Sequence, residues 1–535
     1  MSATIAGLAT RSYEQIRAAL LARQEIALLD VREEAPHAIA HPLFAANLPL
    51  SQLELLVYAR IPRCDTAIVV LDDGEGLAAT AAARLSALGY SDVAILAGGI
   101  SGWQADGGEL FQDVNVPSKA FGELVESCRH TPSLSAQEVQ ALLDSEADLV
   151  VLDARRFDEY QNMNIPGSVS VPGAELALRV RALAPDPHTR VIVNCAGRTR
   201  SIIGTQSLVN AGIPNQVHAL RNGTIGWTLA GQQLEHGSSR RFSVAVSADD
   251  GHQAAVAARN VADRAGVKRL AWDGLQDLRK DAKRTTYLFD VRTPQEYESA
   301  HVSGFLSAPG GQLVQETESN APVRGARIVL LDDDGVRANM TASWLAQMGW
   351  EVYALDGLEA KHFKLSGPVG RSLPPAPQAD QISPATLAAW LQESGAGATV
   401  VLDFSASVNY VREHIPGAHY VLRSQLQQAW SALPDAARYV LTCGSSLLAA
   451  YAITEVAALS DKPVFLLEGG NAAWKAAGLP LQSGETALAS PRIDRYRRPY
   501  EGTDNPASAM QAYLDWEFGL VEQLGRDGTH GFFVI

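Results

Sequence analysis

Four short apolar runs in this chain each end in an aspartate, and a similar order of segments follows each of them. The runs end at Asp30, Asp153, Asp290 and Asp403. Such short, continuously apolar runs are typical of strands buried on both faces of a parallel sheet. The chain therefore has to be read as a series of related units, and internal repeats decide the fold before any other feature does.

A second apolar run follows each aspartate at a nearly constant distance. The distance to the end of this run is 42 residues in the first three copies and 40 in the fourth. Chance does not preserve such a register, so we interpret the four units as copies of one domain. The paired positions are Asp30 with Asp72, Asp153 with Cys195, Asp290 with Asp332 and Asp403 with Cys443.

A loop and a predicted helix come after the second run, and glycines at 89, 212 and 349 end this helix in copies one to three. Strands alternating with helices predict the α/β class, with a parallel sheet flanked by helices on both faces and right-handed crossovers. We therefore expect four tandem α/β domains and a C-terminal helical tail. The predicted bounds are 1–127, 128–243, 244–372 and 373–490 for the domains and 491–535 for the tail helix.

Composition limits the functions that such a chain can have. Its 535 residues exceed what one core of roughly 250–300 residues holds. A net charge of -15 disfavours nucleic acids and anionic membranes as partners. Four dispersed cysteines suit a reducing compartment better than a disulfide framework. The N-terminus lacks an uninterrupted apolar stretch and no apolar run reaches 18 residues, so we expect a cytoplasmic protein that does not cross a membrane.

The loops after the second strand differ between the copies, and the loop of copy two has the features of a reactive site. The thiolate is the nucleophilic form of cysteine, and main-chain amides at a helix N-terminus favour an anion. Gly197 allows the loop to turn tightly, while Arg198 and Arg200 add positive charge. We therefore expect the Cys195 sulfur to be held as a thiolate. The four loops begin Cys195-Ala196-Gly197-Arg198-Thr199-Arg200, Asp72-Asp73-Gly74, Asp332-Asp333-Asp334 and Cys443-Gly444-Ser445.

Several motifs together resemble the rhodanese family of sulfurtransferases. A strand that ends in Asp-x-Arg occurs in copies one to three, Asn-Ile-Pro-Gly-Ser begins at Asn164, and His-Ile-Pro-Gly-Ala begins at His414. The segment Asn-Cys-Ala-Gly-Arg-Thr-Arg-Ser around Cys195 completes the likeness. The chain is most similar to multidomain bacterial thiosulfate sulfurtransferases, and the resemblance covers nearly all of it up to about Pro491.

The resemblance implies a two-step reaction by nucleophilic catalysis. The Cys195 thiolate takes the sulfane sulfur of an anionic donor such as thiosulfate, sulfite leaves, and the resulting persulfide passes its sulfur to a thiol or to cyanide. Neither a metal nor an organic cofactor is implied. Thiosulfate and 3-mercaptopyruvate both remain open as donors. The implied site residues are Cys195 as nucleophile, Ala196, Gly197, Arg198, Thr199 and Arg200 around the substrate, and Asp153 with Arg155 as a supporting pair.

Other interpretations of the same residues lead to different functions. Three copies without the full loop also fit a persulfide carrier or scaffold whose inactive repeats bind a partner protein. A cysteine phosphatase is less favoured, because its Cys-x5-Arg loop is one residue longer than Cys195 to Arg200. We interpret Cys443, which lacks the arginines, as vestigial, and Asp72 and Asp332 as marks of inactive loops. The tail helix, apolar on two faces, should pack on the domains or bridge two subunits of a homo-oligomer.

Overall fold

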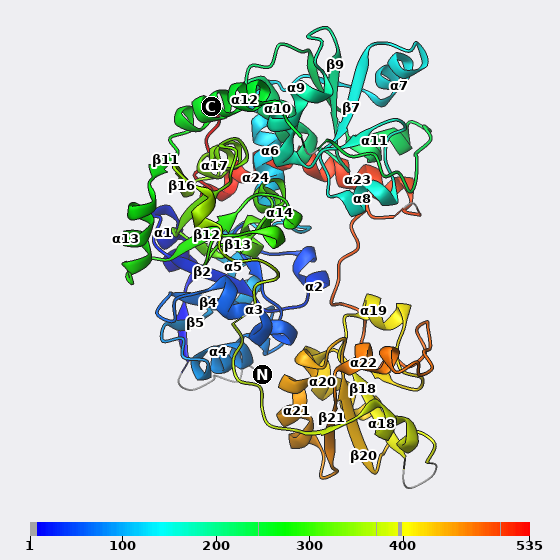
Figure 1. The fold of residues 1–535 in the computed structure, drawn as a ribbon. Helices are drawn as coiled ribbons and strands as arrows, with labels where there is room; N and C mark the ends of the chain where they lie inside the picture. Colours follow the sequence, from blue (N-terminus) through cyan, green and yellow to red (C-terminus); the bar gives the residue numbers. More distant parts are fainter. Residues whose placement is uncertain (1–7, 244, 371, 394–397, 503) are drawn as a thin grey trace.

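The protein is described by a computed structural model that covers residues 8–243, 245–370, 372–393, 398–502 and 504–535. Each of the four copies forms a sheet of its own with helices on both faces, which confirms the predicted fold class (Figure 1). Within the described ranges, no helix combines the length and apolar character that a bilayer crossing requires.

The second copy holds a five-stranded parallel sheet in the order β6-β10-β9-β7-β8. Its two central strands are apolar and buried because helices cover both faces. The strands are β6 (Ser133–Leu134), β7 (Leu149–Asp153), β8 (Val169–Ser170), β9 (Arg190–Asn194) and β10 (Val217–Leu220). The helices are α7 (Ala136–Asp144), α8 (Phe157–Asn162), α9 (Leu176–Leu183), α10 (Thr199–Asn210) and α11 (Gly223–Leu229).

The first and third copies repeat this plan and are joined through a shared sheet. Strand β14 (Val323–Arg324) of copy three pairs antiparallel with β2 of copy one, so one sheet draws on both copies. Copy one contains β1 (Ala9–Arg11), β2 (Ile26–Asp30), β3 (Ala46–Asn47), β4 (Ile68–Leu71), β5 (Val93–Leu96), α1 (Tyr13–Leu21), α2 (Glu34–Ile39), α3 (Leu53–Arg60), α4 (Leu77–Ala87) and α5 (Gly99–Ala105). Copy three contains β11 (Lys268–Leu270), β12 (Thr286–Asp290), β13 (Leu306–Ser307), β15 (Arg327–Leu331), β16 (Glu351–Leu355), α13 (Trp272–Lys280), α14 (Pro294–Ser299), α15 (Gly310–Gln315), α16 (Thr317–Asn320) and α17 (Arg337–Gln347).

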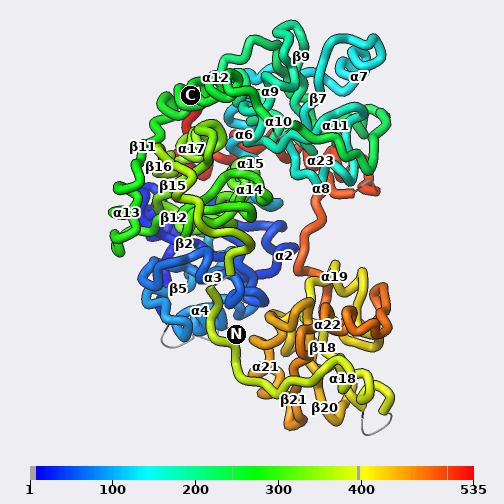
Figure 2. The backbone as a smooth tube through the Cα atoms, viewed as in Figure 1, coloured from blue at the N-terminus to red at the C-terminus, as the bar shows by residue number. Residues whose placement is uncertain are grey.

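The fourth copy forms a separate lobe that lies beside copy one (Figure 2). Ion pairs hold the two together, since Arg423 bonds to Glu54 with a nitrogen–oxygen distance of 2.6 Å. The elements are β17 (Asp380–Ile382), β18 (Thr399–Asp403), β19 (His419–Tyr420), β20 (Arg438–Thr442), β21 (Val464–Leu467), α18 (Pro384–Trp390), α19 (Ser407–Arg412), α20 (Leu426–Ala429), α21 (Leu447–Leu459) and α22 (Gly470–Ala476).

Two helices lie at or next to the predicted boundaries between domains. Helix α6 (Val116–Arg129) packs on α10, and the predicted boundary at 127 falls inside it. Helix α12 (Ala248–Arg264) packs on α9 and α17, between copies two and three. Both bury an apolar stripe, with Phe121 and Val261 fully enclosed. Neither helix recurs in all four copies, so comparison of the copies could not predict that these segments are helical.

The tail consists of two helices instead of the predicted single helix. Helix α23 (Ala507–Phe518) ends at Gly519, and α24 (Leu520–Asp527) follows directly. Figure 2 shows the tail leaving the fourth copy and returning to the second, where α23 packs on α6 and α11. The apolar faces of the tail are therefore covered largely within this chain, and assembly through the tail stays a prediction.

Candidate active site

The predicted nucleophile lies where β9 gives way to α10. Cys195 follows the last strand residue directly, and the loop after it enters the first turn of the helix at Thr199. The Cys195 thiol donates to Ser201 Oγ at 3.4 Å, and that hydroxyl in turn donates to the carbonyl oxygen of Arg198 at 2.8 Å. The sulfur is thus held at the N-terminal end of α10, where the helix dipole favours negative charge.

The burial of the Cys195 thiol opposes the thiolate that the sequence predicts. Cys195 is only 1% exposed, and this burial raises the pKa of its thiol above the ordinary value. The positive charge of Arg200 and the hydrogen bonding with Ser201 work in the opposite direction but do not outweigh burial. The enclosure of the sulfur, which the sequence cannot reveal, thus works against the expected thiolate, whereas Arg200 favours it.

The N-terminal end of α11 holds the Cys195 loop through main-chain hydrogen bonds. This contact was not predicted from the sequence. The amides of Thr224 and Ile225 donate to the carbonyl oxygens of Cys195 and Ala196 at 2.9 and 3.0 Å. Gly223 permits this approach, because an added Cβ would lie 2.3 Å from the Cys195 oxygen. This close contact explains why glycine occupies position 223.

Asp153 and Arg155 form the buried pair that the sequence predicted. Arg155 Nε and Nη2 donate to the two carboxylate oxygens of Asp153 at 2.9 and 2.7 Å. The same guanidinium donates to the carbonyl of Met163, and Asn194 donates to Asp153 at 2.8 Å. The pair thus ties the end of β7 to the segment after α8 and to the residue before Cys195.

Arg200 connects the sulfur to a cavity that several arginines line. Both of its terminal nitrogens bond to the carboxylate of Glu159 at 2.8 Å. Arg200 also lines a cavity of about 370 Å³ between copy two, copy three and the tail. The other arginines that line this cavity are Arg155, Arg156, Arg495 and Arg498. Four acids, Asp158, Glu159, Glu316 and Glu501, line the same cavity, so its lining holds one more arginine than acids.

Arg198 lies differently from the expected placement beside a substrate. Its guanidinium donates to both carboxylate oxygens of Glu123 at 2.7 and 2.9 Å, and Glu126 provides a further ion pair. The ring of Phe518 lies over it at 4.3 Å. Arg198 therefore anchors the loop to α6 and to the tail, because α6 brings two carboxylates that the repeat pattern does not contain.

The remaining loop residues contact helices from outside the repeat. Ala196 and Thr199 are 2% and 8% exposed. Thr199 abuts α6, where a Cβ added at Gly122 would lie 3.0 Å from its methyl group. Gly197 faces α23, whose Tyr513 and Glu517 side chains approach it closely. Neither Tyr513 nor Glu517 was predicted to contact the site, and the only signal in the sequence was a tail helix that needed burial on two faces.

The corresponding loops of copies one and three hold carboxylates instead of a sulfur. Asp72 accepts hydrogen bonds from the amides of Gly74 and Ala78 at 3.2 and 3.0 Å. Asp332 does the same with Ala338 at 2.8 Å and with Gly335 at 3.1 Å. A carboxyl side chain thus occupies the main-chain amides of these two loops at the position that Cys195 has in copy two.

The loop of copy four retains its cysteine. Cys443 is 6% exposed, and burial raises the pKa of its thiol. Main-chain hydrogen bonds from Ala449, Ser445 and Leu448 oppose that rise, while no arginine belongs to this loop. It therefore lacks the cationic contribution that Arg200 makes to the Cys195 site.

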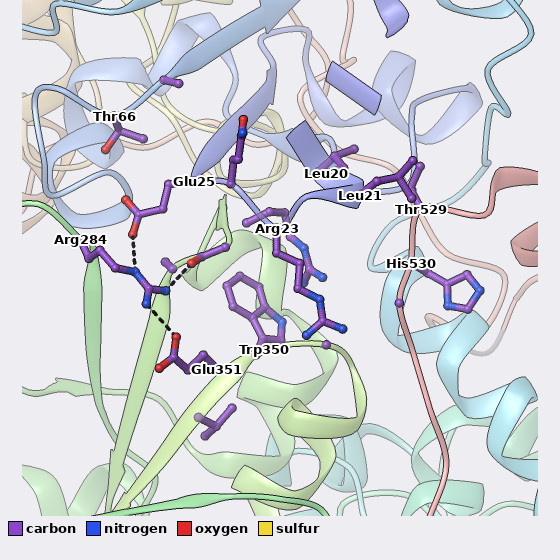
Figure 3. Close-up of a pocket in the computed structure, with 18 of the residues that line it drawn as sticks. Leu20, Leu21, Arg23, Glu25, Thr66, Arg284, Trp350, Glu351, Thr529 and His530 are labelled. Atoms are coloured by element: carbon purple, nitrogen blue, oxygen red, sulfur yellow. Dashed lines mark hydrogen bonds and ion pairs between the residues drawn. The ribbon is translucent and has the colours of Figure 1, made fainter. Parts of the chain in front are cut away.

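A wide cavity of about 940 Å³ between copies one and three is a less suitable candidate for this chemistry (Figure 3). Figure 3 shows Arg284 between the carboxylates of Glu25 and Glu351, and its distance to Glu351 is 2.8 Å. None of the Cys195 loop residues lines this space. Across the described parts of the chain, no group of three or more His, Cys, Asp or Glu side chains is arranged to hold a metal ion.

Comparisons with known proteins agree with the geometry of the four copies. The family described as Rhodanese-like domain matches residues 13–106, 135–230, 272–357 and 383–477. A crystal structure of thiosulfate sulfurtransferase from Pseudomonas aeruginosa is 71% identical, with a TM-score of 0.97, and covers 99% of this chain and 100% of that one.

Two curated relatives match parts of the chain. A thiosulfate sulfurtransferase from Azotobacter vinelandii is 26% identical over 204 residues, which is 34% of this chain and 74% of the relative. The putative sulfur carrier protein YrkF from Bacillus subtilis is 25% identical over 103 residues, or 19% of this chain. The chain spans about half of that relative's length, 54%.

Proposed function

Because the chain belongs to the rhodanese family, we propose that it is a thiosulfate sulfurtransferase whose reaction takes place at Cys195 in the second domain. One observation carries this assignment. Of the four equivalent loops, that of domain two alone joins a cysteine at a helix N-terminus to an arginine whose charge acts on the sulfur. Domains one and three place aspartates at the same position, and a carboxyl group cannot form a persulfide.

The reaction proceeds in two displacements at sulfur. The Cys195 thiolate attacks the outer sulfur of thiosulfate, a new sulfur–sulfur bond forms, and the old one breaks so that sulfite departs with its electron pair. The persulfide left on Cys195 carries the negative charge on its terminal sulfur. A thiolate or cyanide then attacks that terminal sulfur and restores the Cys195 thiolate. Arg200 and the N-terminus of α10 favour both anionic forms.

The arginines of the cavity beside Arg200, which outnumber its acids by one, favour thiosulfate as the donor. Thiosulfate carries two negative charges in a small volume, whereas 3-mercaptopyruvate carries one. Guanidinium groups bind such oxyanions through paired hydrogen bonds. Arg200 lines the cavity, and its charge also acts on the Cys195 sulfur, so it connects the place where an anion would gather with the nucleophile.

The decisive experiment compares two cysteine variants of the full chain. Cys195→Ser should abolish thiocyanate formation from thiosulfate and cyanide, because a hydroxyl cannot form a persulfide. Cys443→Ser is the matched control, since Cys443 has the same place in domain four, and it should retain most of the activity. Mass spectrometry after thiosulfate exposure should locate one added sulfur on the peptide containing Cys195. Full activity in Cys195→Ser, or an adduct on another cysteine alone, contradicts the assignment.

A further inference from the structure

The C-terminal helix α23 lies directly on the loop that carries Cys195. A Cβ added at Gly197 would be 3.2 Å from Cε1 of Tyr513 and 3.4 Å from Oε2 of Glu517. The equivalent positions of two other domains have no such cover, because a Cβ added at Gly74 of domain one would meet no described atom within 4 Å and Ser445 of domain four is exposed. Figure 1 shows how the tail reaches this position from the far end of the chain. Contact with the tail therefore distinguishes the Cys195 loop from the loops of domains one and four.

Glu517 is an unusual residue to find at such a contact. Its side chain is fully buried, and its Oε1 accepts a hydrogen bond from the Tyr513 hydroxyl at 2.8 Å. Its Oε2, which points towards Gly197, has no hydrogen-bond partner among the described residues. A buried carboxylate oxygen without a partner is costly in its charged form, whereas a protonated carboxyl avoids most of that cost.

The cations around Glu517 are already paired with other acids. Lys119 Nζ of α6 lies 2.7 Å from Asp113 and is surrounded by the rings of Tyr500, Tyr513 and Trp516. Arg198 of the loop is held by Glu123 of α6. The charged and titratable groups that face Glu517 are thus Lys119, Glu123 and Asp113 at α6, Cys195 and Arg198 in the loop, Tyr513 on α23, and Tyr500 before it.

Burial outweighs these cations and raises the pKa of Glu517 to about 8. Near neutral pH its carboxyl is therefore mostly protonated. Above that range it becomes an anion close enough to Cys195 to raise the pKa of the thiol as well. Glu517 and Cys195 both become negative when they ionise, and they share one enclosed site. Ionisation of either group therefore opposes ionisation of the other.

We propose that Glu517 is a positioning residue of the Cys195 site: its neutral carboxyl lets α23 rest on Gly197, and its ionisation opposes formation of the Cys195 thiolate. The importance of this for catalysis rests on the proposed function, whereas the coupling between the two groups does not. While Glu517 holds its proton, its carboxyl group is neutral. No negative charge from this side chain then lies beside the nucleophile or beside an anionic donor.

Thiol alkylation in the full chain tests the coupling without using sulfur transfer. Glu517→Gln keeps the size of the side chain but cannot ionise. We expect the rate of Cys195 alkylation by iodoacetamide to match that of the wild type at pH 6.5 and to exceed it by up to about tenfold at pH 9. The exposed thiols of Cys64 and Cys128 provide an internal control and should react equally in both proteins. Glu522→Gln, an exposed position on α24, is the matched control variant.

Identical Cys195 alkylation profiles in the wild type and a folded Glu517→Gln variant overturn the proposal. If that variant does not fold, Tyr513→Phe provides the second test. Removal of the hydroxyl takes away a hydrogen bond that lowers the pKa of Glu517, so the retardation of alkylation should begin at higher pH. An unchanged onset in Tyr513→Phe also contradicts the proposal. Failure of the proposed function would appear instead as full sulfur transfer by Cys195→Ser, whatever the alkylation profiles show.

Discussion

A methyl group placed at Gly223 tests whether the geometry of the Cys195 loop controls the reaction. Gly223 has a φ of +54°, in the left-handed region that favours glycine. A Cβ there would also lie 2.3 Å from the carbonyl oxygen of Cys195. Domain four offers a matched site, since Gly470 has a φ of +62° and its Cβ would lie 2.3 Å from the carbonyl oxygen of Cys443.

The size of the effect follows from these contacts. Real Cβ atoms essentially never approach within 3.0 Å, so the loop must move by at least 3.0 minus 2.3, or 0.7 Å. A shift approaching 1 Å at a reacting group costs on the order of 100-fold in rate. We therefore expect kcat/KM of Gly223→Ala to fall by roughly 10- to 100-fold. The left-handed conformation adds a loss of about 1–3 kcal/mol in the stability of domain two.

Thiocyanate formation at several thiosulfate concentrations gives the kinetic effect, and denaturant unfolding gives the stability. Gly470→Ala should destabilise domain four by a similar amount and leave kcat/KM unchanged, because its loop is not the proposed site. Equal losses of activity in the two variants would refute the reasoning, since general destabilisation would then explain both. Unchanged kinetics in a folded Gly223→Ala would refute it as well.

Two further variants test the ion pairs around the loop. Arg198→Ala leaves the Glu123 carboxylate buried without its partner, and we expect a loss of about 3–5 kcal/mol in the free energy of unfolding, measured with denaturant. A loss below 1 kcal/mol would show that Arg198 does not anchor the loop. Although burial opposes ionisation of Glu159, the charge of Arg200 lowers its pKa to about 2, so the pair stabilises the fold above pH 4.5 and this contribution disappears as the pH falls towards 2. Glu159→Gln should flatten the fall in melting temperature between those pH values, and an unchanged acid limb would contradict this.

The repeat explains why so much of the fold could be predicted from the sequence. The 42-residue register from Asp153 to Cys195 predicted where two buried strands end, and β7 ends at Asp153 while β9 ends at Asn194, directly before Cys195. The environment of Arg198 could not be predicted in the same way. Its partners lie on α6, some 75 positions earlier in the chain, in a segment that no other copy repeats. Periodicity reveals what the copies share, whereas contacts between a copy and a unique segment depend on tertiary packing.

The unique segments also suggest why domains without a reactive loop are retained. Helix α23, which lies over the Cys195 loop, is held in place by parts of the chain outside domain two. Leu520 and Leu524 of α24 are buried in the core that joins domains one and three. The last residue of the chain, Ile535, donates its amide to the Gln347 side chain of domain three at 3.0 Å. Because α23 and α24 are consecutive, these contacts fix one end of the helix that presents Tyr513 and Glu517 to Gly197. Domains one and three, whose loops hold an aspartate in place of the cysteine, therefore help to determine the position of α23 over the Cys195 loop.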